Sequence, residues 1–515
     1  MSQTLLKALQ NPDLYDHPVS GFTLMETHIS WILLTGDFVY KIKKPVNFGF
    51  LDYSSLDQRK HFCEEEVRLN RRLAPDLYLG VVAVHGTETS PSLESDGPVI
   101  EYMVKTRQFQ QQDLLGNLQR AGALTSEHID SLASKLASFH QHIDPAPLPS
   151  PWGEPDNLHA PVADNFSDIR PLLSDASDLA QLDQLEQWAH TTFQRLIPQL
   201  AQRKAEGFVR ECHGDIYLDN VTLIDGQVTL FDGIEFNEAF RWIDVMSDVA
   251  FMVMDLEDRG LTQLAQRFLN AYLEQTGDYA GLALLDYYKA YRAMVRAKVA
   301  LLRLTQEGVS ATERQEVLAR YHSYAHLAER YTRVPLRFGI LTHGISGSGK
   351  STVALQLVEK LGAIRIRSDV ERKRLFGSAG SGELDAGLYA PERSDKTYAR
   401  LASLAGQILA AGYPVVVDAT NLKLTQRTLL RQAVEDQGTP CLILQCSAPL
   451  DTIEAWMDKR REAGRDPSDA DISIARQQQQ QAETLTAEER AISLQVATDS
   501  TESMANLISQ LRQRF

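Results

Sequence analysis

The 515-residue sequence has few cysteines and no long apolar segment. Its four cysteines have neither C-x-x-C spacing nor a pattern typical of a disulfide framework, so we expect neither disulfides nor cysteine-based metal sites. No apolar run approaches the roughly 20 residues that a membrane-spanning helix needs. The N-terminus also lacks the long apolar stretch of a signal peptide. We therefore expect a cytoplasmic protein without a membrane partner.

An excess of positive charge is also missing, because the net charge is −16. The segment from Leu336 onward contains 22 Lys/Arg and 22 Asp/Glu, whereas the preceding part contains 30 and 46. Neither part has the bulk basicity of a nucleic-acid binder, which weighs against nucleic acid as a partner and leaves only a local basic groove open. An acidic cleft in the first part would suit a cationic or neutral substrate better than a polyanion.

The chain is too long for a single hydrophobic core, and its signals divide it into three segments. Residues 1–105 contain β-type runs joined by a Gly-Asp hairpin signal, and we expect them to form a small α+β lobe. Residues 106–333 have mainly helical periodicity, interrupted over 144–168 by a break rich in Pro, Asp and Ser. The Val-Pro pair that follows marks the boundary to a third segment, residues 336–515.

Strand and helix signals alternate in the third segment, which predicts a parallel sheet with helices on both faces. A run of glutamines at Gln477 to Gln481 is expected to form a polar helix face. The five expected strands are Phe338–His343, Ala363–Arg367, Pro414–Asp418, Cys441–Cys446 and Ser493–Thr498.

A P-loop signature, G-I-S-G-S-G-K-S, runs from Gly344 to Ser351 with the full G-x-x-x-x-G-K-S spacing. A strand signal leads into it and a helix signal over Lys350–Leu361 leads out. Glycines let backbone N–H groups curl around phosphates, and the helix N-terminus adds its dipole. We expect Lys350 to reach the β and γ phosphates of ATP and the Ser351 hydroxyl to bind Mg²⁺. The residues expected to contact the nucleotide here are Gly344, Ser346, Gly347, Ser348, Gly349, Lys350, Ser351 and Thr352.

Three later features indicate phosphoryl transfer rather than binding alone. Asp369 follows the second expected strand, where its carboxylate can accept the proton of an attacking hydroxyl. Asp418 ends a buried strand in V-V-V-D-A-T-N, a suitable position for orienting Mg²⁺ or its waters. An Arg-rich segment with Arg460, Arg461 and Arg465 can close over the nucleotide and stabilise charge in the transition state.

This segment resembles the small P-loop kinases, which include polynucleotide 5′-kinase, the zeta-toxin kinases and the gluconate-kinase-like group. The resemblance covers about residues 337–515. The D-x-x-R of Asp369 and Arg372 is similar to the base-plus-arginine pair of the polynucleotide-kinase and zeta-like members. It implies that Arg372 acts in catalysis together with Asp369 and Lys350.

A second phosphate-handling signature, H-G-D-I-Y-L-D-N, runs from His213 to Asn220 and is followed by F-D-G around Asp232. Asp215 and Asn220 have the five-residue separation of a kinase catalytic loop, so we expect Asp215 to accept the proton of an acceptor hydroxyl. Asn220 and Asp232 are expected to hold Mg²⁺. His213 is expected mainly to brace the loop.

These motifs resemble those of the aminoglycoside phosphotransferase family, which includes choline-kinase-like small-molecule kinases. The resemblance extends over about residues 21–331 and implies a bilobal, protein-kinase-like fold with ATP bound between the lobes. It also implies a strand lysine that binds ATP and a helix carboxylate that pairs with it. We favour Lys41, with Lys43 on the same strand face as the alternative. For the carboxylate we favour Glu65, one helical turn before Leu69, with Glu66 as the alternative.

Several neighbours of these motifs complete the expected site. Glu235 and Asn237 follow Asp232 and are expected to face the cleft, whereas Asp244 and Asp248 are expected to be mainly structural. Two protein-kinase features are missing, since no G-x-G-x-x-G precedes the strand lysine and no A-P-E follows Asp232. Both absences argue against a protein kinase.

The order of the two halves resembles bacterial proteins in which an aminoglycoside phosphotransferase-like domain is fused to a P-loop kinase of AAA or zeta-toxin type. The expected fold is therefore an α+β kinase-like domain followed by an α/β P-loop domain with a parallel sheet. The expected function is a bifunctional ATP- and Mg²⁺-dependent phosphotransferase acting on hydroxyl groups of small molecules. The alternatives are a polynucleotide 5′-kinase in the P-loop half, a regulatory ATP-binding module in one half, or a protein-modifying kinase or toxin.

Overall fold

The computed structural model describes residues 3–49, 51–94, 97–306, 308–333, 336–377, 390–463 and 472–514. The chain forms two compact units that are each built from two segments. The first unit contains residues 1–255 and 291–325, and the second contains residues 256–290 and 326–515. The boundary expected at Val334-Pro335 lies outside the described residues. No helix of the described part of the chain is long and apolar enough to cross a membrane.

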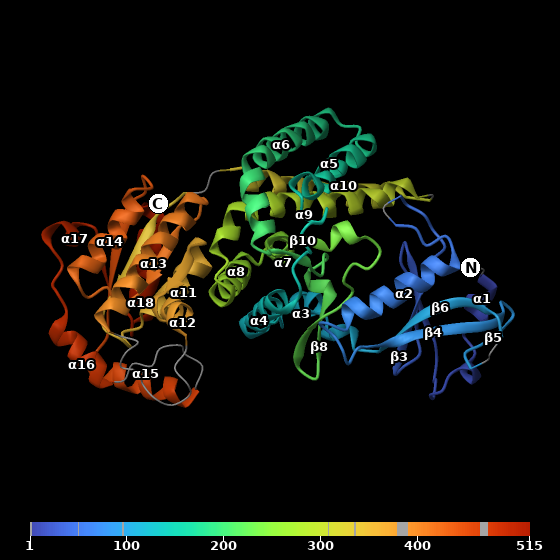
Figure 1. The fold of residues 1–515 in the computed structure, drawn as a ribbon, viewed down its shortest axis with the longest axis horizontal. Helices are drawn as coiled ribbons and strands as arrows, with labels where there is room; N and C mark the ends of the chain where they lie inside the picture. The colour runs from blue at the N-terminus through green and yellow to red at the C-terminus, as the bar shows by residue number, and fades with distance from the viewer. Residues whose placement is uncertain are drawn as a thin grey trace. The chain divides into compact units, whose positions relative to one another are not determined.

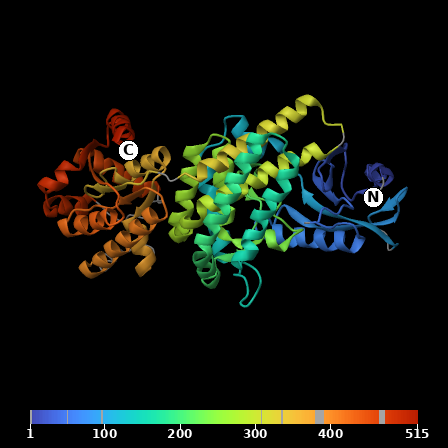
Figure 2. The same cartoon turned by 90° about the horizontal axis from the view of Figure 1, so that it is seen from above.

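The first unit begins with an antiparallel sheet in the order β1-β2-β3-β6-β4-β5. The hairpin expected at Gly36-Asp37 is present between β2 and β3. Helix α2 (Leu56–Asn70) lies along one face of this sheet in both views (Figures 1 and 2). The strands are β1 (Thr23–Glu26), β2 (Ser30–Leu34), β3 (Phe38–Lys43), β4 (Tyr78–Thr87), β5 (Ser90–Ser92) and β6 (Val99–Arg107), and a short helix α1 (Gln3–Ala8) precedes them.

Helix α2 begins at a capping box, in which Ser55 and Gln58 satisfy each other's backbone N–H groups. The side chains that it buries follow helical spacing and therefore form one stripe. This stripe contains Arg59, Cys63, Glu66, Val67 and Asn70. The carboxylate of Glu66 belongs to this stripe and therefore faces the sheet, where the site described below lies.

The helical part of the first unit follows the sheet. Helix α4 follows Thr125, whose hydroxyl accepts the His128 backbone N–H and caps the helix. The break expected over 144–168 is only partly a loop, because its second half forms helix α5 with Pro155 in the first turn, where proline is tolerated. The helices are α3 (Leu115–Arg120), α4 (Ser126–His142), α5 (Pro155–Ile169), α6 (Ala176–Ala205), α7 (Val245–Asp258), α9 (Leu282–Leu302) and α10 (Ala311–Tyr331), of which α7, α9 and α10 are shared with the second unit.

Two short strand pairs hold the H-G-D segment between the helices. Strand β7 (Val209–Glu211) pairs with β10 (Trp242–Asp244), and β8 (Val221–Ile224) forms a hairpin with β9 (Gln227–Leu230). The catalytic-loop motif therefore lies between β7 and β8, and F-D-G follows β9 directly.

The second unit contains the five-stranded parallel sheet that the alternating signals predict, in the order β12-β13-β11-β14-β15. Each observed strand lies within one or two residues of its expected bounds. The strands are β11 (Gly339–His343), β12 (Ile364–Arg367), β13 (Val415–Asp418), β14 (Cys441–Ser447) and β15 (Ser493–Ala497). The helices that follow the strands are α11 (Lys350–Leu361), α12 (Ser368–Phe376), α13 (Pro391–Ala410), α14 (Leu424–Glu435), α15 (Leu450–Ala463), α16 (Ile472–Gln481), α17 (Ala487–Ala491) and α18 (Thr501–Arg514).

Helices cover this sheet as expected (Figure 1). Residues of α11 and α18 share one apolar core with inward-facing strand residues such as Ile340, Val416 and Leu444. Helix α16 contains the glutamine run, so the expectation of a helix there is confirmed.

Helix α8 (Thr262–Thr276) belongs to the same compact unit as the parallel sheet and packs on its edge strand β12. The side-chain amide of Asn270 donates to the Ala363 carbonyl (3.3 Å) and accepts from the Arg365 backbone N–H (2.7 Å). Glu274 forms ion pairs with Arg365 (2.8 Å) and Arg367 (3.1 Å). The Asn270 amide thus supplies hydrogen bonds that a neighbouring strand would otherwise make.

Candidate active sites

The H-G-D loop of the first unit brings Asp215 and Asn220 together. The Asn220 amide donates to the Asp215 backbone carbonyl and to its Oδ2, both at 2.9 Å. Gly214 has φ 86°, and a Cβ there would lie 2.6 Å from the Phe240 carbonyl oxygen, so this position requires glycine. Burial raises the pKa of the Asp215 carboxyl, and the positive charge of Arg296 opposes that rise. A carboxylate with a raised pKa is suited to general-base chemistry.

His213 braces the loop through both ring nitrogens. Its Nε2 is 2.9 Å from the Phe231 carbonyl, so it donates, and its Nδ1 then accepts the Asp215 backbone N–H at 3.3 Å. Burial lowers the pKa of His213, which agrees with the neutral tautomer that these contacts require. The structure thus supports the bracing role predicted for this histidine.

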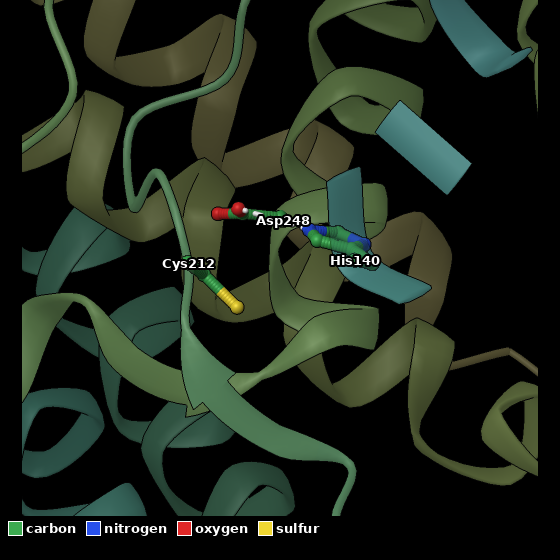
Figure 3. Close-up of side chains that lie close together, drawn as sticks. All are labelled: His140, Cys212 and Asp248. Atoms are coloured by element: carbon green, nitrogen blue, oxygen red, sulfur yellow. Dashed lines mark hydrogen bonds and ion pairs between the residues drawn. The ribbon is translucent and has the colours of Figure 1, made fainter. Parts of the chain in front are cut away.

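Asp248 on α7 holds the backbone of the same loop. Its carboxylate accepts the N–H groups of His213 and Gly214, each at 2.9 Å, and lies 3.4 Å from His140 Nε2. Cys212 lies beside this carboxylate (Figure 3). These three side chains have the ligand types of a metal site, but both Asp248 oxygens already accept hydrogen bonds and burial raises the pKa of the Cys212 thiol well above its usual range. The cluster is therefore a structural brace, as predicted for Asp248.

Asp244, the other acidic residue expected to be structural, forms a buried bidentate ion pair with Arg203.

Two arginines of α9 lie at the catalytic loop. Arg292 donates to the Gly214 carbonyl at 2.9 Å, and the Arg296 guanidinium stacks 4.5 Å above the Tyr217 ring. Sequence reasoning missed both arginines, because about 80 residues separate them from the loop that they contact.

Asp232 follows β9 and has φ 61°, a left-handed conformation that is uncommon for aspartate. Such backbone strain is typical of functional positions. Burial alone would raise the pKa of Asp232, but Lys41, whose Nζ lies 2.6 Å from Oδ1, lowers it below its usual value. Asp232 is therefore held as a carboxylate.

Lys41 and Lys43 project from the same face of β3, and both contact Glu66 on α2. Lys41 Nζ lies 3.0 Å from Glu66 Oε1, and Lys43 Nζ lies 2.7 Å from Oε2. Lys41 is the lysine that also reaches Asp232. Glu65, which the sequence favoured, instead pairs with Arg68 at 2.7 Å, so the choice of Glu65 over Glu66 is wrong for this ion pair. The physical reason is helical phase, because Glu66 belongs to the buried stripe of α2 and Glu65 lies beside it.

Lys43 is fully buried and forms a second ion pair with Glu235, whose carboxylate also accepts the Tyr53 hydroxyl at 2.5 Å. Glu235 and Asn237 line a cavity of about 740 Å³, as expected for residues that face a cleft. Phe62, Trp152 and Glu238 also line it. The cavity combines aromatic faces with carboxylates.

The P-loop of the second unit joins β11 to α11. Gly347 and Gly349 both have φ 80°, and a Cβ at Gly344 would lie 2.4 Å from the Cys446 carbonyl oxygen. A side chain at any of these three positions would therefore strain the backbone or clash with a neighbouring atom. The Gly344 N–H donates to the Thr420 carbonyl at 3.1 Å, which ties the loop to the D-A-T-N segment.

The remaining P-loop residues contact their own loop and helix α16. Lys350 Nζ donates to the Ile345 carbonyl at 2.5 Å, and the Ser346 N–H donates to the side chain of Gln478 at 2.7 Å. Ser348 is buried within the loop, and Ser351 and Thr352 lie in the first turn of α11. The contact from Gln478 was not predicted, since a glutamine run gives no signal for which member points inward.

Asp418 and Asp369 lie at the carboxyl edge of the parallel sheet. Asp418 ends β13, and its Oδ2 is buried without a hydrogen bond from any described residue, with Arg367 Nε 3.7 Å away. Asp369 opens α12 and accepts a hydrogen bond from Arg372 at 3.2 Å, so the structure brings the expected D-x-x-R pair together. Burial raises the pKa of Asp369, and Arg372 and Arg367 oppose that rise.

The side chains of Arg460 and Arg461 and all of residues 464–471, including Arg465, lie outside the described residues. Their role as a basic segment over the nucleotide stays a prediction.

Both sites have the donor chemistry that Mg²⁺ requires, since hard cations prefer carboxylate, amide and hydroxyl oxygens. In the first unit these donors are Asn220 and Asp232, and in the second they are Ser351 and Asp418. Asp418 Oδ2 accepts no hydrogen bond from a described residue, although Arg367 Nε lies 3.7 Å away, and such a buried oxygen fits a cation or its waters. The residues present therefore fit the ion.

Comparison with known proteins matches each half to a family. Residues 39–285 match the Phosphotransferase enzyme family (APH), and residues 340–485 match an AAA domain (AAA_33). Over 474 residues the chain is 30% identical to Uncharacterized protein Rv2004c of Mycobacterium tuberculosis strain H37Rv, an alignment that covers 89% of this chain and 91% of the relative. The two resemblances read from the motifs are thereby confirmed, and so is the fold class.

Two solved structures illustrate the separate halves. A choline/ethanolamine kinase family protein from Mesorhizobium loti is 13% identical, with a TM-score of 0.40 and coverage of 64% of this chain and 97% of that chain. The APS kinase CysC of Mycobacterium tuberculosis is 22% identical, with a TM-score of 0.25 and coverage of 35% and 98%.

Proposed function

We propose that both halves of the chain are catalytic. The chain belongs to a family that joins a phosphotransferase domain to an AAA-type P-loop kinase domain, and it is an ATP-dependent phosphotransferase. Each half transfers the γ-phosphate of ATP to a hydroxyl group of a small molecule. The halves therefore use two ATP sites and two acceptor sites.

In the first unit, Asp215 accepts the proton of the acceptor hydroxyl as that oxygen attacks the γ-phosphorus, and ADP leaves. The raised pKa of Asp215 makes this carboxylate a stronger base than an exposed aspartate. Lys41 binds phosphate oxygens of ATP, and Glu66 holds its ammonium group in place. Asn220 and Asp232 would hold Mg²⁺, which neutralises charge on the phosphates when it is bound.

In the second unit, backbone N–H groups of the P-loop and Lys350 bind the phosphates of ATP. Asp369 accepts the proton of the acceptor hydroxyl, and Arg372 orients its carboxylate. Ser351 and Asp418 would hold Mg²⁺. The acceptor is a small molecule rather than nucleic acid, since the charge of the segment from Leu336 onward is balanced.

One observation carries the proposal for two active halves. Each half holds its own carboxylate in place through a side-chain contact, Asp215 through Asn220 at 2.9 Å and Asp369 through Arg372 at 3.2 Å, and burial raises the pKa of both carboxyls. A module that only bound ATP would not need such a base. Perturbed carboxylates of this kind are typical of catalytic sites.

Transfer of label from γ-phosphate-labelled ATP into a metabolite extract tests this function, with protein and small molecules separated afterwards. We expect label in small molecules, and we expect Asp215→Asn and Asp369→Asn each to abolish a different labelled product. Label that survives in both variants would contradict the proposal. If only one substitution removes a product, the other half is a regulatory ATP-binding module. Label in protein alone, or in added oligonucleotide alone, would assign a protein-modifying kinase or a polynucleotide kinase instead.

A further inference from the structure

The glutamine run on α16 supplies one side chain to the P-loop. Of the five residues from Gln477 to Gln481, only Gln478 is partly buried, and the other four are exposed. The Gln478 Oε1 accepts the backbone N–H of Ser346 at 2.7 Å. Because the N–H group can only donate, the contact identifies the oxygen of the amide as the atom that faces the loop. The Gln478 amide oxygen thus accepts the hydrogen bond that the Ser346 N–H of the P-loop would otherwise donate to another acceptor.

Apolar packing holds α16 against the loop at this point. Ala475 precedes Gln478 by three residues and is its neighbour on the helix surface, and Ile472 precedes Ala475 by three. They pack in a small core with Ile345 of the P-loop and with Ile453 and Met457 of α15. This packing places the backbone of Gln478 beside the P-loop, within reach of the Ser346 N–H.

Glycine at position 347 permits this close packing. A Cβ on Gly347 would lie 2.8 Å from Ile453 Cγ2 and 2.7 Å from Met457 Cε. Helix α15, which packs with α16 in the same small core, therefore approaches the P-loop backbone more closely than a side chain at position 347 would permit. The Gln478 contact belongs to a packed arrangement rather than to a free side chain on the surface.

We propose that Gln478 is a built-in competitor for a phosphate position of the P-loop: its amide oxygen must leave the Ser346 N–H before a phosphate oxygen can bind there. This inference rests on the proposed nucleotide site of the second unit. Without Gln478, the free protein loses one hydrogen bond, whereas the nucleotide complex loses none. Removal of the side chain therefore raises the free energy of the unbound state relative to the bound state and tightens nucleotide binding.

Titration calorimetry with a non-hydrolysable ATP analogue and Mg²⁺ tests the inference. Full-length protein carrying Lys41→Ala, which weakens the site of the first unit, serves as the background. In that background we expect Gln478→Ala to bind the analogue roughly two- to tenfold more tightly, the range that one net hydrogen bond gives. Gln479→Ala is the matched control, since it removes an exposed neighbour of the same type, and we expect no change. Unchanged or weaker binding by Gln478→Ala would overturn the inference.

A charged replacement gives an independent measurement on the same position. Gln478→Glu keeps the acceptor and adds negative charge beside the phosphates, so we expect binding to weaken about tenfold or more. Binding as tight as in the background protein would contradict a position at the phosphates. Thermal unfolding of each variant verifies that the fold is retained.

Failure of the inference and failure of the proposed function give different results. Lys350→Ala in the same background removes the P-loop lysine and should remove the tighter binding event that Lys41→Ala leaves. If it does not, the P-loop is not the nucleotide site and the proposed function fails with the inference. If it does, while Gln478→Ala binds no more tightly, only the inference about Gln478 is wrong.

Discussion

The two phosphate sites of this chain satisfy their polar groups by different means. In the first unit the groups are charged side chains, and Lys41, Glu66 and Asp232 neutralise one another through ion pairs. In the second unit the groups are mostly backbone N–H groups, and neutral acceptors such as the Gln478 amide satisfy them. The first site therefore depends on which charges are present, and the second depends on backbone shape. Substitutions of charge and of glycine should accordingly affect the two sites differently.

The largest effect is expected for the base of the charge-dependent site. Asp215→Asn removes the proton acceptor while keeping the side-chain shape, so we expect kcat at that site to fall about 10²- to 10⁴-fold. Product formation by the P-loop half should be unchanged, because the two sites use separate residues. Asp225→Asn, at an exposed hairpin position of the same unit, is the matched control and should leave both rates intact. A fall of less than tenfold would exclude Asp215 as the base.

The shape-dependent site should respond to a single added methyl group. Gly349→Ala places a Cβ 2.7 Å from Thr498 Cβ at φ 80°, so we expect the free loop to relax away from this conformation and nucleotide binding to weaken about 30- to 150-fold. Binding must then restore the loop, at roughly 1–2 kcal/mol for the left-handed conformation and about 1 kcal/mol for the steric clash.

Gly438→Ala is the control for this substitution, because it adds a methyl group at a left-handed position without a steric clash. Gly438 also has positive φ (64°), but a Cβ there meets nothing within 4 Å. Gly438→Ala should reduce the free energy of unfolding by about 1 kcal/mol and leave nucleotide binding unchanged. Equal nucleotide affinities for both alanine variants would show that loop shape does not determine binding.

Substitution of the adjacent residues Glu65 and Glu66 tests which carboxylate pairs with the ATP-binding lysine of the first site. Glu66→Gln leaves Lys41 and Lys43 without a shared partner, so we expect kcat/KM to fall about tenfold or more. Glu65→Gln weakens ion pairs with Arg68, whose side chain is about half exposed, and with Arg241 at 3.3 Å, but neither arginine is a proposed ATP-binding group, so its effect should be within about twofold. Steady-state kinetics on the two variants decides between the neighbours, and a larger loss for Glu65→Gln would reverse the assignment.

The smallest effect concerns the pH dependence of the first site. Asp215 must be ionised to accept a proton, burial raises its pKa, and Arg296 opposes that rise. Arg296→Gln leaves burial unopposed, so the pKa of Asp215 rises further and a smaller fraction is ionised at acidic pH. The acid limb of kcat/KM should therefore move to higher pH, with a several-fold loss of activity within the limb and little change on the plateau above it.

Lys298→Gln, on the same helix, is the control for this pH dependence, because Lys298 pairs with Asp168 instead. Its acid limb should coincide with that of the unmodified protein. An acid limb that also stays in place for Arg296→Gln would mean that another group controls the ionisation.

Local patterns predicted much of this molecule, because they depend on near neighbours in the chain. The five parallel strands, the hairpin at Gly36-Asp37 and the P-loop all follow from short-range signals. The preference for Glu65 was wrong although a local signal existed, since the spacing of Cys63, Val67 and Asn70 places Glu66 on their stripe. That stripe is the better guide because burial, rather than distance to a single leucine, decides which carboxylate faces the sheet.

Other parts of the sites could not be predicted from local signals. Arg292 reaches the Gly214 carbonyl across 78 positions, and Gln478 reaches Ser346 across 132. Each contact depends on how whole helices pack. A run of identical glutamines carries no information about which member is turned inward, because only the apolar residues before it fix the phase of the helix.

The packing of α8 on the parallel sheet also determines how the protein can be dissected experimentally. Cutting the gene between the codons for residues 333 and 336 would separate Asn270 and Glu274 from strand β12. The released P-loop fragment would then have an uncapped edge strand, which invites aggregation. The excised first part would retain an α8 that had lost its packing partners. Studies of one activity at a time are therefore better made by inactivating the other site in the intact polypeptide than by truncation.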